Sequence, residues 1–131
     1  MSETKVKPVI AEELMTALQS EVSAESQVIL HCCIRSEMFP EEKIRIWAST
    51  YLVDRKSEHV SRLIHFENIS LFPDWTDIPF GKDYWFTLVF SGLPKDCKAF
   101  DFIELIPQNG GFFHEGIRRN SSDVYRIKLD I

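Results

Sequence analysis

The stretch from Tyr84 to Leu105 constrains the fold more than any other part of the chain. Two apolar runs, Tyr84–Phe90 and Ala99–Leu105, flank a loop that carries Gly92 and Pro94. Apolar side chains alternate with other residues in both runs, and this period of two is typical of strands with one buried face. We therefore predict a hairpin of two strands at the centre of a β-sheet core.

The same alternation recurs along most of the chain. It predicts further strands over Gln27–Arg35, Lys43–Val53, His59–Leu71 with a break near Asn68, Phe112–Ile117, and Val124–Leu129. Turns or loops separate the strands at Ser36–Glu42, Asp54–Glu58, Phe72–Asp83 and Asn109–Gly111. Roughly seven or eight short strands of this kind predict an all-β fold: an immunoglobulin-like antiparallel β-sandwich, with a small closed β-barrel as the alternative.

The N-terminal part of the chain follows a different pattern. The 131 residues fit one domain, which we expect to span residues 9–131 behind a flexible arm of residues 1–8. Within residues 9–22, Leu14, Leu18 and Val22 recur at intervals of four, which favours a helix over 11–21. The many strands elsewhere favour an irregular first strand instead, and we lean slightly towards the strand.

The charge balance and the cysteines bear on partners and location. The formal net charge is −5, which opposes binding to the phosphates of nucleic acids or to an anionic membrane surface. The sequence shows no apolar run as long as a signal peptide or a membrane span. Three cysteines are an odd set, so at least one thiol is unpaired. We expect a soluble cytoplasmic protein that binds neither nucleic acid nor membrane.

One spacing suggests an antibody-type domain. Cys32 and Cys97 flank Trp47, as cysteines flank a tryptophan in such domains. However, Cys97 falls in the predicted loop, and Lys95 stands where the corner tyrosine would be. We therefore do not expect a disulfide between Cys32 and Cys97.

A closer resemblance lies in three segments: IRIWASTYLVD, FENISLFPDW and FTLVFSGLPKDCKAFDFIEL. They resemble uncharacterised bacterial immunoglobulin-like domains, a group similar in pattern to the sandwich named after a telomere repeat-binding factor. The resemblance covers roughly residues 28 to 117, and its motifs are structural. It implies a fold and brings no catalytic residues with it.

Catalytic signatures are missing from the sequence. It contains no HExxH, CxxC, GxSxG or glycine-rich phosphate loop, so we expect no metal or cofactor. Asp101 and Glu104 are three apart on a predicted strand, which directs them to opposite faces. We expect Asp101 to face solvent, and Glu104 to lie at an edge or to pair with an arginine.

A face rich in aromatic and basic residues is the best candidate for function. Alternation directs Lys43, Arg45, Trp47 and Tyr51 to one side of their strand, and Trp75 lies in the long loop. Exposed aromatic side chains beside charges are typical of contact surfaces, unless the long loop or the N-terminal segment covers them. We predict a non-catalytic protein-interaction or assembly module that binds a protein partner or forms a homodimer.

The alternative is a small-ligand binder or an enzyme whose site is assembled from distant positions. Its candidate groups are His31, Cys33, His65, His114 and Glu115. This alternative requires at least two of these side chains to meet in one concave pocket.

Overall fold

A computed structural model describes residues 26–130, which contain strands, turns and no helix. The arm at residues 1–8 and the ambiguous segment at 9–22 lie outside the described residues. The strands are β1 (Gln27–Arg35), β2 (Lys43–Ile44), β3 (Thr50–Asp54), β4 (His59–Glu67), β5 (Thr76–Asp77), β6 (Asp83–Ser91), β7 (Ala99–Glu104), β8 (Phe113–Arg118) and β9 (Val124–Lys128). The predicted all-β fold class is therefore confirmed.

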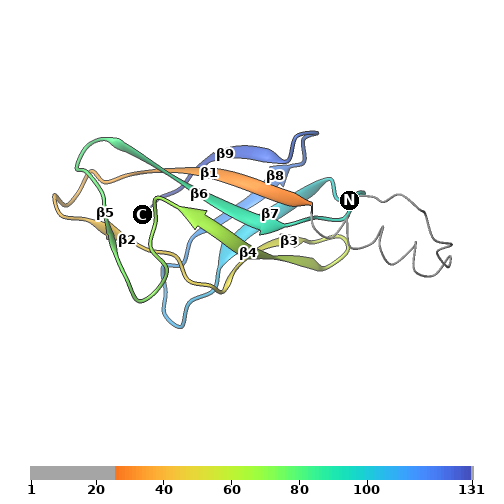
Figure 1. The fold of residues 1–131 in the computed structure, drawn as a ribbon, viewed down its shortest axis with the longest axis horizontal. Helices are drawn as coiled ribbons and strands as arrows, with labels where there is room; N and C mark the ends of the chain where they lie inside the picture. Colours follow the sequence, from red (N-terminus) through yellow and green to blue (C-terminus); the bar gives the residue numbers. More distant parts are fainter. Residues whose placement is uncertain (1–25, 131) are drawn as a thin grey trace, which may run out of the picture.

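Seven strands form one curled sheet in the order β8-β7-β3-β4-β6-β1-β9, and β2 pairs with β5 in a small second sheet. The large sheet curls into a half-barrel, and the small sheet lies at the opposite end of the long axis from the start of β1 (Figure 1). All neighbouring strands are antiparallel except β1 and β9, which are parallel. The arrangement is sandwich-like, and one parallel pair distinguishes it from the fully antiparallel expectation.

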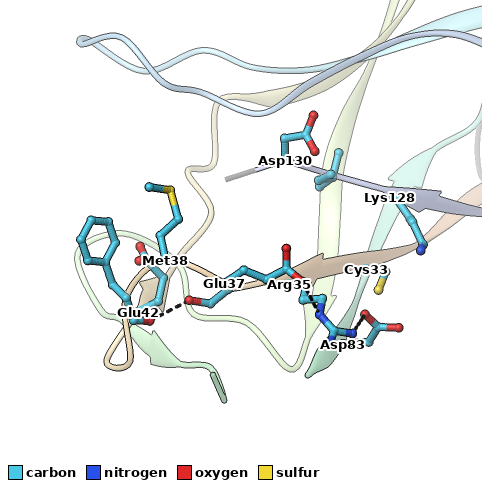
Figure 2. A pocket seen from close by; sticks show the side chains of 11 residues that line it. Cys33, Arg35, Glu37, Met38, Glu42, Asp83, Lys128 and Asp130 are labelled. Atoms are coloured by element: carbon cyan, nitrogen blue, oxygen red, sulfur yellow. Dashed lines mark hydrogen bonds and ion pairs between the residues drawn. The ribbon is translucent and has the colours of Figure 1, made fainter. Parts of the chain in front are cut away.

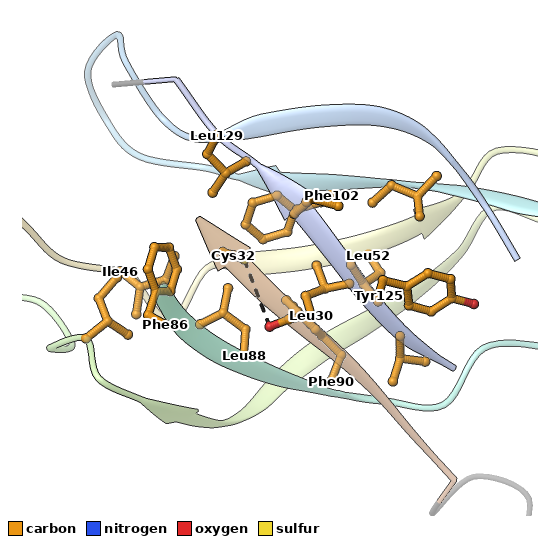
Figure 3. Close-up of a cluster of buried hydrophobic side chains, with 14 of the residues drawn as sticks. Leu30, Cys32, Ile46, Leu52, Phe86, Leu88, Phe90, Phe102, Tyr125 and Leu129 are labelled. Atoms are coloured by element: carbon orange, nitrogen blue, oxygen red, sulfur yellow. Dashed lines mark hydrogen bonds between the residues drawn. The ribbon is translucent and has the colours of Figure 1, made fainter. Parts of the chain in front are cut away.

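The core fills the concave side of the curled sheet (Figure 3). On β1, Val28, Leu30, Cys32 and Ile34 are buried, as their alternation predicts. Aromatic rings cross the core in edge-to-face pairs, including Phe100 with Tyr125 at a centroid distance of 5.1 Å. Tyr125 belongs to β9, so this last strand helps to close the core.

The predicted hairpin of β6 and β7 is wrong, although both strands exist. β6 pairs with β1 and β4, whereas β7 pairs with β3 and β8. The two strands instead face each other across the core, where Phe90 and Phe102 meet edge to face at 6.1 Å. Leu93 and Cys97 of the connecting loop are buried, so the loop carries the chain across the core rather than turning it back beside β6.

The predicted strand Lys43–Val53 is also divided. It splits into β2 and β3 because Ile46 bonds to the middle of the β4–β5 connection. The Ile46 N–H donates to the Ser70 carbonyl at 2.8 Å, and the Ile46 carbonyl accepts from the Phe72 N–H at 2.8 Å. The break near Asn68 is confirmed, since β4 ends at Glu67 and Asn68 has a φ of 65°. The long loop at Phe72–Asp83 contains the short strand β5.

Candidate functional site

An arginine enclosed by aromatic rings is the most conspicuous surface feature. The guanidinium carbon of Arg45 lies 3.8 Å from the ring centroid of Trp75, 4.6 Å from that of Phe72 and 5.9 Å from that of Trp47. The rings of Trp47 and Phe72 stack at 3.9 Å, and the guanidinium donates to the Pro73 carbonyl at 3.2 Å. We call Arg45, Trp47, Phe72 and Trp75 the Arg45 cluster.

The interruption of the predicted strand builds this cluster. Ile46 is fully buried, so its neighbours Arg45 and Trp47 project outward on either side of it. The two backbone hydrogen bonds of Ile46 fix the segment against the connection that carries Phe72. Phe72 and Trp75 remain 42% and 52% exposed. Part of the long loop thus covers Trp47 while adding exposed aromatic surface of its own.

A small pocket of about 190 Å³ adjoins the cluster. Its lining includes Lys43, Arg45, Trp47, Trp75 and Glu104. Lys43 is exposed and forms an ion pair with Asp77 at 2.7 Å. Asp130 also lines it, so the pocket is bordered by two cations, two indole rings and two carboxylates.

Glu104 is the functional-site residue that sequence reasoning placed wrongly. It is buried, with 7% exposed, rather than at an edge or ion-paired with an arginine. Its carboxylate accepts from the Trp47 N–H at 2.9 Å and from the Phe112 N–H at 3.1 Å. Burial raises the pKa of this carboxyl above its ordinary value, against the opposing effect of the two hydrogen bonds. Glu104 thus joins two loops at the floor of the pocket.

A second, larger pocket of about 530 Å³ lies nearby (Figure 2). Arg35 on its wall pairs with Glu37 at 2.9 Å and with Asp83 at 3.3 Å. Met38 and Phe39, 81% and 61% exposed, form its rim. Asp130 lines both pockets, and the adjacent residues Glu42 and Lys43 line one pocket each. The two pockets and the Arg45 cluster therefore form one continuous region, which we call the end surface.

Four of the five residues predicted for the contact face meet in this region: Lys43, Arg45, Trp47 and Trp75. Tyr51 does not line the pocket. It lies on β3 opposite Arg62 and Ile103, because the division of the predicted strand breaks the alternation between Trp47 and Tyr51. Phe72 was missed, although it stands beside Trp75 in the sequence FPDW.

The alternative set of site residues is dispersed. His31 bonds to Thr87 Oγ1 at 2.8 Å, and His65 pairs with Glu67 at 3.2 Å. Cys33 lines the larger pocket, while Glu115 lines a separate hollow of about 410 Å³. His114 lies half-buried on β8. None of the three pockets described in residues 26–130 is lined by two members of this set.

The cysteines of the described residues are not activated for nucleophilic chemistry. All three cysteines are buried free thiols, and burial raises the pKa of Cys33, which makes it a poorer nucleophile at neutral pH.

Asp101 is buried, not solvent-facing as expected, because Arg55 covers it with an ion pair and the Gly116 N–H donates to it at 2.9 Å. Within the described part of the chain, no group of three or more His, Cys, Asp or Glu side chains is arranged to hold a metal ion.

Comparisons with known proteins add no relative. The chain matches no family model, no curated protein and no solved structure. No helix in residues 26–130 has the length and apolar character that crossing a lipid bilayer demands.

Proposed function

We propose that this chain is a non-catalytic protein-interaction or assembly module whose contact surface is the end surface. The observation that carries the proposal is the Arg45 cluster. Tryptophan and arginine dominate the energetics of protein interfaces, and here they stand together beside a pocket that a partner side chain can enter.

The cluster is also organised before a partner arrives. Arg45 stacks on Trp75 and is anchored by the Pro73 carbonyl, so its long side chain has already lost much of its rotamer freedom. Binding then costs less conformational entropy than it would for a freely rotating arginine. Within residues 26–130 no carboxylate forms an ion pair with Arg45, which leaves its charge available to a partner.

The remaining parts of the proposal rest on the sequence. We propose a soluble, cytoplasmic location, which the buried free thiols support, because the cytosol keeps cysteines reduced. The resemblance to bacterial immunoglobulin-like domains is retained as a proposed relationship. The net charge of −5 supports a protein partner or a second copy rather than nucleic acid or an anionic membrane.

Affinity capture with a matched pair of variants tests the proposal. Trp75 and Trp85 are both exposed, 52% and 40%, and each has an arginine over its ring, but only Trp75 lines the end surface. The tagged full chain should capture a protein from the lysate of its own organism. Trp75→Ala should lose that protein, and Trp85→Ala should keep it. Equal capture by both variants, or no enrichment by the wild type in lysate and no self-association in solution, would refute the end surface as a contact site.

The larger pocket supports a second candidate, a small-ligand binder. Its volume of about 530 Å³ lies in the usual range for ligand sites. Ligand-observed NMR with a collection of small molecules checks this candidate. Ligands of this pocket should lose binding in Phe39→Ala, at the rim, and keep it in Phe113→Ala, which is comparably exposed on β8. If no compound shows this pattern, the small-ligand candidate is wrong.

A further inference from the structure

The convex side of the sheet carries an apolar patch that is separate from the end surface. Its members lie on β3, β4, β7 and β8 and project away from the core: Tyr51, Val53, Val60, Ile64, Ile103 and Phe113. We call them the outer patch. Val60, Ile64 and Phe113 are 52%, 44% and 52% exposed. A contiguous apolar surface is a candidate site for contact with another segment or molecule.

Strand register makes the outer patch continuous. Phe113 stands opposite Ile103, Ile103 opposite Tyr51, and Tyr51 opposite Arg62. One row of side chains therefore crosses four strands and ends at an exposed arginine. Within residues 26–130 no carboxylate forms an ion pair with Arg62. The row is apolar along most of its length and, among the described residues, ends at a positive charge that has no ion-pair partner.

The chain enters the described structure close to this row. β1 begins at Gln27, which pairs with Ser91 of β6, and Ser91 Oγ accepts from the Arg62 N–H at 3.1 Å. β1 is separated from β4 by β6 alone, a distance of about 10 Å at the usual strand spacing. The residues between Val22 and Gln27 can span up to about 15 Å when extended. The preceding segment is therefore within reach of the outer patch.

The sequence of that segment complements the outer patch. Residues 9–22 carry Leu14, Leu18 and Val22 at intervals of four, together with the three carboxylates of Glu12, Glu13 and Glu21. We propose that residues 9–22 cover the outer patch, with their apolar side chains against the sheet and a glutamate beside Arg62. This inference concerns a different face from the end surface, so it stands or falls separately from the proposed function.

Intramolecular cross-linking of the full chain tests this inference. Leu18→Cys combined with Ile64→Cys should form a disulfide under mild oxidation, detected by mass spectrometry of the peptides. Leu18→Cys combined with Val124→Cys is the matched control. Val124 is 39% exposed and lies on β9, where it pairs with Ile29 near the start of β1, on the side of β1 away from the outer patch. We expect at least tenfold more cross-link for the Ile64 pair. Equal yields would overturn the inference, and so would disulfides that form only between two molecules, which would assign the outer patch to a second copy.

A labelling measurement keeps the inference testable if the double variants fold poorly. With Ile64→Cys alone, the rate of reaction with a thiol reagent should rise about tenfold when Leu18→Asp is added. Glu12→Gln, which keeps the apolar side chains, should leave that rate within about threefold. An unchanged rate in the Leu18→Asp protein would mean that residues 9–22 do not cover Ile64.

Discussion

At the scale of single residues, Glu104 is central to the end surface. One carboxylate oxygen accepts from the Trp47 N–H and the other from the Phe112 N–H. At this point, where two loops meet, a side chain accepts the hydrogen bonds that backbone carbonyls accept within a sheet. A carboxylate can serve two donors at once because both of its oxygens accept. Trp47 is therefore held in place by the carboxyl group of Glu104, which also lines the pocket.

Glu104→Gln should destabilise the fold. Glutamine has a single acceptor oxygen, so one of the two buried N–H donors is left without a partner. An unsatisfied buried donor costs about 1–3 kcal/mol, which a shift in the urea midpoint of unfolding would measure. Glu67→Gln is the control, because Glu67 is exposed on β4 and its replacement should cost less than about 1 kcal/mol. A Glu104→Gln protein as stable as the wild type would contradict the role given to this carboxylate.

The difference in stability between the wild type and Glu104→Gln should depend on pH. Burial raises the pKa of Glu104 in the folded chain above its ordinary value of 4.5, so the folded state binds this proton more tightly than the unfolded state. The contribution of Glu104 to stability is therefore fullest below pH 4.5 and is lost as the pH rises through the raised pKa. The stability advantage of wild type over Glu104→Gln should be larger at about pH 4 than at about pH 7. A larger advantage at the higher pH would mean that the sign is wrong.

Gly111 makes a second prediction at this scale. A β-carbon at Gly111 would overlap the backbone carbonyl oxygen of Glu104, which cannot rotate away. Gly111→Ala should cost at least about 2 kcal/mol of unfolding free energy, because the loop must shift. Gly81→Ala is the comparison: its β-carbon meets no atom within 4 Å, so only the positive φ of 72° costs stability, about 1 kcal/mol. Chemical denaturation of both variants checks the order, and a smaller loss for Gly111→Ala would contradict the close approach.

Sequence reasoning located most of the candidate site but not its centre. Lys43, Arg45, Trp47 and Trp75 were recognised because exposed aromatic and basic residues stand out in composition and alternation. Glu104 was placed wrongly because a carboxylate that bonds to backbone N–H groups leaves no sequence signature. One donor, Trp47, lies 57 residues before Glu104 in the chain, and only the fold brings it to the same carboxylate as Phe112.

At the scale of elements, alternation found the strands but not their neighbours. The bounds of β1 and the buried faces of β1 and β9 follow from the period of two. The pairing of β6 with β7 did not follow, because a loop with buried Leu93 and Cys97 looks in sequence like an ordinary hairpin connection. A pattern of period two specifies which face of a strand is buried, but it does not specify which other strand pairs with it.

A double-mutant cycle tests the arrangement of β6 and β7 across the core. Phe90→Ala and Phe102→Ala remove fully buried rings, and each should cost about 3–5 kcal/mol of unfolding free energy. The two rings meet edge to face, so the cycle should show a coupling of about 0.5–1.5 kcal/mol. If the Phe90→Ala, Phe102→Ala double variant yields too little folded protein, the same cycle is measured with Phe90→Leu and Phe102→Leu. Strictly additive losses would contradict the contact.

At the scale of the whole molecule, the fold separates two surfaces. The end surface lies beside β2 and β5, far along the molecule from the start of β1 (Figure 1). The outer patch lies on the convex side of the large sheet, close to where the chain enters β1. The proposed protein contact rests on the preorganised arginine–aromatic cluster of the end surface. The dispersed set of His31, Cys33, His65, His114 and Glu115 does not converge in any pocket described in residues 26–130.

The most direct test is the dissociation constant of the captured partner for the wild type, Trp75→Ala and Trp85→Ala, measured by calorimetry on the purified proteins. If the partner is a second copy of the chain, sedimentation equilibrium measures the same constant. An interface centred on the Arg45 cluster predicts a loss of at least about 2 kcal/mol for Trp75→Ala, which is roughly a 30-fold weaker constant. Trp85→Ala should bind within about threefold of the wild type, because Trp85 lies outside the end surface. Binding by Trp75→Ala as tight as that of the wild type would contradict the account.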